Sequence, residues 1–259
     1  EWLSIKPALA GSRRDIEDKQ YDVTSMFQRL PWDSPFDEEG NLVPNRYTGW
    51  VNSSNSNYLY DLQWNKSNST NYEFMGNLDF DIRITDWLSF SSVNNYKYIG
   101  YNYSEYTDPR SSSGDGRMRE YQTTTVRRYS NHIIRFNKMF GKHSINALAA
   151  YEFNDYWAKA TDMYGIGFIP GFEVLDVVAK PEKVGGSISE WAVQSLLFNA
   201  NYAFDNKYLA QLSFRRDGAS NFGDNAKYGN FFSISAGWNI NREKWFHTSW
   251  VDILKLRIS

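Results

Sequence analysis

Apolar and polar side chains alternate strictly over three stretches, Ser195–Phe204, Tyr208–Asp217 and Phe232–Asn241. In the first stretch the even positions, such as Leu196 and Phe198, are apolar, whereas the odd positions include serine and asparagine. A period of two over about ten residues predicts a β-strand with one apolar and one polar face. About ten residues is long for a soluble strand and is the length that crosses a bilayer at a tilt. The pattern therefore predicts three strands of a transmembrane β-barrel wall.

The same alternation, less regular in places, predicts six further strands: Trp2–Ala10, Phe74–Ile84, Trp87–Ile99, Thr123–Met139, His143–Phe153 and Ile253–Arg257. Short turns are predicted near Asp86, Gly141, Asp205 and the segment Arg242–Asp252. Long loops are predicted at 11–71, 100–122, 154–186 and, carrying a motif, 218–228. Bacterial outer-membrane barrels have short periplasmic turns and long extracellular loops. We therefore expect an all-β fold, an antiparallel transmembrane β-barrel of nine strands within this chain, with its long loops outside the cell.

Composition agrees with a barrel wall. Aromatic residues make up 17% of the chain although its mean hydropathy is −0.61. A lipid-facing aromatic surface together with a polar lumen gives both values. The absence of cysteine excludes disulfides and thiolate metal sites, and a formal charge of −2 argues against a nucleic-acid partner.

The segment Arg215–Gly223 reads RRDGASNFG, and Lys227–Trp238 reads KYGNFFSISAGW. Together they resemble a segment of the SusC/RagA family of TonB-dependent outer-membrane transporters, roughly R-x-D-G-S-S-x-F-G and then G-x-F-P-S-x-S-A-x-W. Asp205–Leu209 is similar to the K-Y-L strand start of that family, and Ile253–Arg257 to its L-K-L-R strand. Two residues differ from the family pattern, Ala219 where serine is usual and Phe232 where proline is usual.

The resemblance implies outer-membrane active import of a bulky nutrient, with an oligosaccharide as the first expectation and a peptide as the second. It implies a SusD-like surface lipoprotein as partner, energy supplied through TonB, no catalysis and no cofactor. A dimer of such SusCD pairs is a further expectation. The whole barrel is expected to have about 22 strands. Residues 1–259 are then part of the barrel domain, and we expect the plug domain and the TonB-contacting segment to lie outside this chain.

Aromatic residues of the predicted long loops are candidate ligand contacts: Trp32, Trp50, Trp64, Tyr101 and Tyr103. Aromatic faces stack on sugar rings while nearby polar groups hydrogen-bond the hydroxyls. The alternative is that these side chains pack the loops together or line the membrane interface. A short helix is predicted over Asp22–Arg29, where the apolar residues share a helical face.

The motif residues Arg216, Asp217, Gly218, Phe222 and Gly223 are expected to shape their loop. Gly218 would let the backbone turn at the strand end, and Asp217 would accept hydrogen bonds from backbone amides in that turn. Arg216 would pair with loop carboxylates, and ligand contact is the alternative role for the motif.

No set of residues in the sequence has the spacing of a catalytic or metal site. The three histidines are not spaced with one another or with carboxylates as metal ligands. Asp79 and Asp81 are interpreted as lumen-facing charges, matched by Arg83. A passive porin and a siderophore or cobalamin receptor remain alternatives, and a soluble β-rich carbohydrate-binding module is an alternative of another class.

Overall fold

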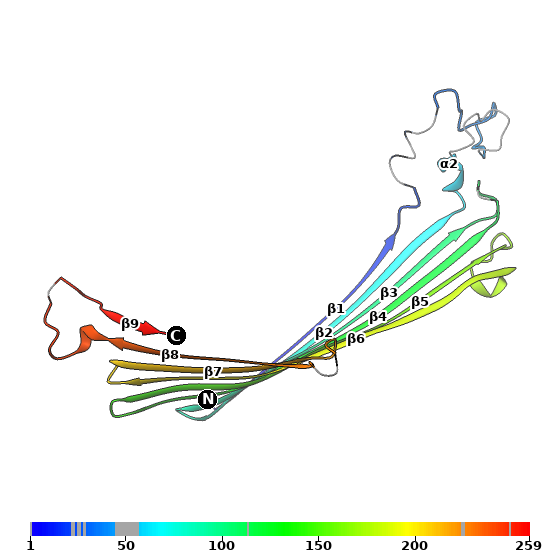
Figure 1. Cartoon of the computed structure of the whole chain (residues 1–259). Helices are drawn as coiled ribbons and strands as arrows, with labels where there is room; N and C mark the ends of the chain where they lie inside the picture. Colours follow the sequence, from blue (N-terminus) through cyan, green and yellow to red (C-terminus); the bar gives the residue numbers. More distant parts are fainter. Residues whose placement is uncertain are drawn as a thin grey trace.

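The computed structural model describes residues 2–21, 24, 27, 30–44, 57–112, 114–223, 226–248 and 250–259. These residues form one antiparallel sheet whose strands lie in sequence order, and the sheet is strongly twisted and curved (Figure 1). The strands are β1 (Leu3–Glu17), β2 (Lys66–Thr85), β3 (Leu88–Thr107), β4 (Arg117–Phe140), β5 (His143–Ile166), β6 (Lys180–Phe204), β7 (Tyr208–Ala219), β8 (Tyr228–Asn239) and β9 (Lys255–Ile258). The predicted all-β fold and its nine antiparallel strands are confirmed.

Three short helical segments accompany the sheet: α2 (Tyr58–Asp61) and the 3₁₀ helices η1 (Leu175–Val177) and η2 (Ile240–Arg242). None of the helices in the described residues has the length and apolar character needed to span a membrane.

Short connections gather at one end of the sheet, which we call the turn end. Gly141 has a φ of 58°, and Asp205 and Asn206 have φ values of 52° and 53°. Positive φ at two consecutive residues is the geometry of the hairpin turn that matches strand twist, and aspartate and asparagine adopt it more readily than other non-glycine residues. The predicted turns at Asp86, Gly141 and Asp205 are therefore present.

A longer connection between β8 and β9 is fastened to the same end of the sheet by Glu243. Its carboxylate accepts hydrogen bonds from Tyr208 at 2.8 Å, Lys207 at 3.0 Å and Trp238 at 3.1 Å. These donors, the Tyr208 hydroxyl foremost, lower the pKa of Glu243. The connection from residue 240 to 254 is thus held close to the β6–β7 turn.

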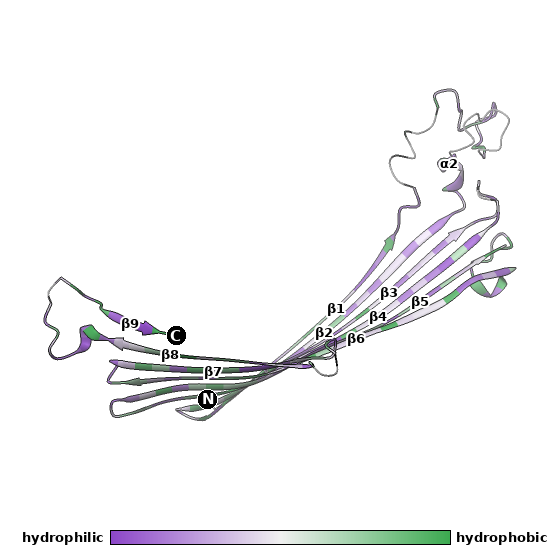
Figure 2. Ribbon diagram, in the orientation of Figure 1, coloured by the Kyte–Doolittle hydropathy of each residue, from purple (hydrophilic) through white to green (hydrophobic). Residues whose placement is uncertain are grey.

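At the opposite end, the loop end, the strands extend much further than the sequence pattern predicts. Strands β2 to β6 are 20 to 25 residues long. The predicted loops 100–122 and 154–186 are wrong in extent, because only residues 108–116 and 167–179 connect the strands. The predicted loop 11–71 likewise shortens to 18–65. Both faces of these strand halves are largely polar, as the purple and white ribbon of β2–β4 in Figure 2 shows, so the two-residue hydrophobic period is lost.

Strands β7 and β8 are shorter, with 12 residues each. The register pairs Val193 with Ala219, the last residue of β7. Residues 180–192 of β6 therefore extend beyond β7, and among the described residues no strand pairs with this edge. On this segment Val184 is 82% exposed and Ile188 is 64% exposed.

The turn-end halves of the strands carry an apolar face and a polar face. Register aligns Leu3, Ile82, Phe90, Ile134, Ala149, Phe198, Phe214 and Phe232 in one row across eight strands. We call this side the outer face, and its apolar rows the apolar belt. The opposite, inner face carries residues such as Asp81, Ser91 and Arg215. A sheet that is apolar only on its outer face suits a wall between lipid and a wet lumen.

Buried apolar packing is found at the loop end. Tyr106, Met118 and Phe168 form a small buried cluster, against which Leu175, Val177 and Val178 pack. This cluster fixes the connection 167–179 to the tips of β3 and β4.

Candidate functional site: the inner wall and cap at the loop end

Aromatic rings line the inner face of the loop-end strand halves. Tyr156 on β5 lies opposite Trp191 on β6 in the register. Their rings are stacked, with centroids 5.8 Å apart and an interplanar angle of 10°. The guanidinium of Arg127, the β4 partner of Tyr156, lies 5.4 Å from the tyrosine ring centroid. The three side chains therefore stack on one another in a single cross-strand row of the inner wall.

A second aromatic group lies nearer the strand tips. The rings of Tyr101 and Tyr121 meet edge to face at 6.4 Å, and Tyr103 lies opposite Tyr121. The Tyr103 hydroxyl accepts from Ser67 at 3.3 Å and donates to Glu105 at 3.2 Å, and burial raises the pKa of Tyr103. Tyr101 and Tyr103 therefore lie on β3, and their predicted place in a loop is wrong.

Charged side chains beside these rings are paired with one another. Asp162 accepts from Arg119 at 3.0 and 3.2 Å and also accepts from Lys183. Asp162 lies well beyond Phe153, where the outer apolar alternation of β5 ends. These two cations, Arg119 foremost, lower the pKa of Asp162 to about 2. The group borders an inner-face recess of 340 Å³, lined by Glu105, Thr107, Arg117, Arg119, Asp162, Tyr164 and Lys183.

A network of buried polar groups holds the connections 18–65 and 108–116 together as one cap. Asp108 is 1% exposed and Asp61 is 2% exposed. Asp108 accepts from the backbone and guanidinium nitrogens of Arg110, each at 2.8 Å, and these bonds lower its pKa. Asp61 accepts from the Ser112 backbone at 2.7 Å and from the Tyr21 hydroxyl at 3.0 Å. The bond from Ser112 to Asp61 thus joins the described parts of the two connections.

The three candidate tryptophans differ in their surroundings. Trp64 is covered by Arg110, whose guanidinium lies 3.9 Å from the ring centroid, so that side chain belongs to the packing of the cap. Trp32 is 64% exposed and presents its ring to solvent. Trp50 lies outside the described residues, as does most of the helix predicted over Asp22–Arg29.

The motif residues lie within and just after β7, and strand alternation divides them between two faces. Asp217 points inward and accepts from Arg215 Nε at 2.7 and 2.8 Å. Arg216 points outward, with its guanidinium 4.6 Å from the Tyr228 ring centroid. The predicted backbone turn at Gly218 is wrong, because Gly218 is a strand residue; a Cβ there would lie 2.5 Å from Tyr228. Asp217 was predicted to accept hydrogen bonds from backbone amides, and Arg216 to pair with loop carboxylates. The structure instead pairs Asp217 with Arg215 and places Arg216 against the Tyr228 ring.

The last two motif residues follow the end of β7. Phe222 is 56% exposed, and a Cβ at Gly223 would meet no atom within 4 Å. The structure gives no packing reason for a phenylalanine at 222 or a glycine at 223.

The inner face of the turn-end half carries its own ion pairs. Asp81 accepts from Lys6 at 2.9 Å and from Ser91 at 2.8 Å, and Arg135 donates to Ser91 at 2.9 Å. Asp81 is therefore paired with Lys6 and not, as predicted, with Arg83. No group of three or more His, Asp or Glu side chains in the described part of the chain is arranged to hold a metal ion.

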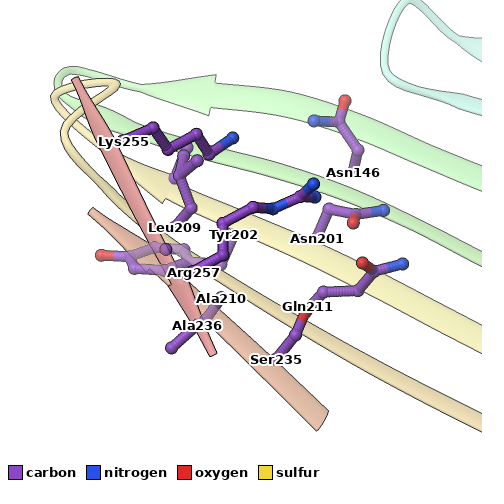
Figure 3. A pocket seen from close by; sticks show the side chains of 12 residues that line it. Asn146, Asn201, Tyr202, Leu209, Ala210, Gln211, Ser235, Ala236, Lys255 and Arg257 are labelled. Atoms are coloured by element: carbon purple, nitrogen blue, oxygen red, sulfur yellow. The ribbon is translucent and has the colours of Figure 1, made fainter. Parts of the chain in front are cut away.

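A recess of 160 Å³ lies at the turn end, over β5–β8 and beside β9, which pairs with β8 (Figure 3). Lys255 and Arg257 of β9 line the recess together with the side-chain amides of Asn146, Asn201 and Gln211. This recess is at the opposite end of the wall from the aromatic groups, and no carboxylate is among its lining residues.

Tyr121, Tyr156 and Trp191 were not singled out from the sequence, because they fall in or beside segments that were interpreted as loops. The signal that could have identified them is the two-residue spacing of aromatic side chains that Tyr101 and Tyr103 show on one strand. It has to be followed from strand to strand through the cross-strand register. Side chains at alternate positions of one strand point to the same face.

Sequence comparison finds similar receptors, although no family model matches the chain. The chain is 26% identical over 250 residues to TonB-dependent receptor P39 of Formosa agariphila, an alignment that covers 91% of this chain and 23% of that receptor. It is 25% identical over 224 residues to TonB-dependent receptor P26 of the same organism, covering 83% of this chain and 22% of the receptor. The chain thus spans less than a quarter of either receptor.

Structure comparison gives the same fold. The RagAB peptide transporter superposes with a TM-score of 0.71 at 20% identity, over 99% of this chain and 30% of that chain. Its closed-closed state gives a TM-score of 0.67 at 21% identity. The predicted resemblance to SusC/RagA-like TonB-dependent transporters is confirmed. The loop end accordingly faces the outside of the cell, the turn end faces the periplasm, and the wall lies in the outer membrane.

Proposed function

We propose that this wall segment of a SusC/RagA-like outer-membrane barrel serves the TonB-driven import of a bulky nutrient. The observation that carries the proposal is the extracellular extension of β3–β6, whose inner face presents the stacked pair Tyr156 and Trp191. A simple pore wall needs only enough strand to cross the bilayer. Strands that continue beyond it with rings on the inner face suit a vestibule that holds a large ligand before passage.

An oligosaccharide is the first cargo that this inner face suits. Flat rings beside hydrogen-bonding groups are the usual surface for sugar rings, and the charges near them are already paired, as at Asp162. A neutral ligand therefore leaves no charge buried without a partner. A peptide is the second candidate, because Arg117, whose contact with Asp115 is as long as 4.0 Å, borders the 340 Å³ recess near these rings.

The proposed assembly has further parts. A SusD-like surface lipoprotein would cover the cap, where Trp32 presents an exposed ring, and two such pairs would form a dimer. TonB would act through a plug domain, and residues 1–259 would form part of the barrel domain only. The proposal contains no catalytic step and no cofactor.

The test is binding and uptake by the full-length protein in its native outer membrane, with fluorescent neutral oligosaccharides and fluorescent peptides as separate probes. Trp191→Ala should weaken oligosaccharide binding by roughly two- to tenfold, because a stacking surface is removed. Trp157→Ala, on the outer face next to Tyr156, is the matched control and should leave binding unchanged.

Two outcomes would contradict the proposal. Equal losses in the two tryptophan variants would show that the inner wall does not contact cargo. Uptake that persists after the proton gradient is collapsed would indicate a passive porin. If Trp191→Ala weakens the binding of peptides alone, the cargo is a peptide.

A further inference from the structure

A second recess, of 310 Å³, lies on the outer face at the extracellular boundary of the apolar belt. A single cross-strand row forms its floor: Phe153, Gln194, Gly218 and Tyr228. Its remaining lining residues are Ala192, Val193, Ala219, Ser220 and Lys227. Its place on the outer face separates it from the lumen and from any path that cargo takes.

Tyr228 is held in a fixed position in this recess. Its ring lies over Gly218, where any Cβ would come within 2.5 Å of the ring edge. Its hydroxyl accepts a hydrogen bond of 2.8 Å from Gln194 Nε2, and Gln194 in turn accepts one of 3.2 Å from Tyr151. Gly218 therefore makes room for an aromatic ring whose outer end is hydrogen-bonded.

Arg216 lies in the next row toward the periplasm, between Leu196 and Asn230. Its guanidinium is 4.6 Å from the Tyr228 ring centroid. The aliphatic part of Arg216 thus lies at the edge of the apolar belt, and its guanidinium lies against the ring of Tyr228, which lines the recess. Long cationic side chains at a bilayer boundary adopt this arrangement because the charge reaches the polar headgroups.

Among the residues that the structure describes, no carboxylate lines the recess. Asp217 is on the inner face, paired with Arg215. Asp155, which lies one row beyond Phe153, is held by Arg128. Lys227 in the lining and Arg216 against the ring of Tyr228 therefore place two cationic side chains at this boundary of the apolar belt.

We propose that this recess binds the phosphate-bearing headgroup of an outer-leaflet lipid. A guanidinium binds phosphate oxygens through two parallel N–H donors, and Ser220 and Lys227 supply polar groups on the same rim. The acyl chains would lie on the belt directly below, where Leu196 is 51% exposed and Phe198 is 38% exposed. The apolar surface directly below the recess suits a lipid, whose acyl chains can cover it, better than a free phosphate ion, which has no apolar part.

The experiment reconstitutes the full-length protein in nanodiscs of phosphatidylcholine that contain a minor fraction of spin-labelled phosphatidic acid. Wild-type protein should immobilise this lipid in preference to spin-labelled phosphatidylcholine. Arg216→Gln should reduce the preference roughly fivefold, the contribution expected of one cation near an anionic surface. Gly218→Ala should also reduce it, because the added methyl group displaces Tyr228. Lys159→Gln, an exposed outer-face cation away from the recess, is the matched control and should change little.

Three results would overturn the assignment. The first is equal immobilisation of the two lipids by the wild-type protein, a comparison that depends on no variant folding. The second is an equal loss of preference in Arg216→Gln and Lys159→Gln. The third is Arg216-dependent binding of inorganic phosphate by lipid-free protein in detergent, which would identify a free-ion site instead.

Discussion

The two halves of the long strands have the same backbone conformation but are stabilised in different ways. In the periplasmic half the outer face is apolar from strand to strand, and lipid would cover residues such as Phe198 and Phe214. In the extracellular half both faces meet water, and cross-strand groups such as Tyr156–Trp191 and Arg119–Asp162–Lys183 join the strands. The comparison teaches that a period of two reports a difference in solvent between two faces. A strand with water on both sides has no such period.

The largest difference between the halves should appear when a charge is placed on the outer face. Phe198→Arg should lower the free energy of unfolding by about 2–4 kcal/mol, because the arginine would enter the hydrocarbon region. Ile188→Arg, on the outer face of the extracellular half, should change it by less than about 0.5 kcal/mol. Urea unfolding of the full-length protein in lipid vesicles measures both values. Equal effects would mean that the apolar belt does not face lipid.

The cap should respond next most strongly, through its buried network. Asp108→Ala removes the acceptor for Arg110 and Tyr106 and should destabilise the cap by roughly 2–3 kcal/mol. Limited proteolysis within residues 57–65 would then become faster while the sheet remains folded. Asp115→Ala is the control, because its side chain is 70% exposed. An unchanged rate in Asp108→Ala would show that the cap does not depend on this network.

The smallest effect should be a pH dependence of the extracellular half. The pKa of Asp162 is lowered from 3.8 to about 2, so its pairs with Arg119 and Lys183 contribute stability at pH values above 3.8. That contribution is lost as the pH falls through the lowered pKa. Between pH 3.8 and about 2, cleavage by pepsin near the tips of β5 and β6 should accelerate. Asp162→Asn should abolish this acceleration, whereas Asp115→Asn should preserve it.

Much of the wall could be predicted from the sequence. Alternation placed the strand pair on either side of Asp205 correctly, because one face there is apolar throughout. The turn itself followed from Asp205 and Asn206, which tolerate positive φ. What could not be predicted was the length of β2–β6, because in segments such as Lys66–Asn71 polar residues occupy successive positions and no face is distinguished.

The motif shows a different limit of sequence reasoning. The segment from Arg215 to Gly218 was recognised as significant, yet the strand was predicted to end at Asp217 and the backbone to turn at Gly218, which lies within β7. Period-two alternation, continued past Phe214, already places Arg216 and Gly218 on one face and Asp217 on the other. The contact between Gly218 and Tyr228 depends on the register of β7 with β8. Such a cross-strand partner is not visible within either segment alone.

The unequal height of β6 and β7 has a consequence for hydrogen exchange. Ala192 directs its backbone N–H and C=O toward Ser220 on the β7 side. The residues of β6 that precede Ala192 by an even number of positions therefore direct their backbone N–H and C=O groups to the same edge. Beyond Ala192 the described residues offer that edge no partner strand. The amides of Val184 and Ile188 should therefore exchange with solvent almost as quickly as those of a loop. Their immediate neighbours, bonded to β5, should exchange slowly, so protection along this one strand should alternate residue by residue.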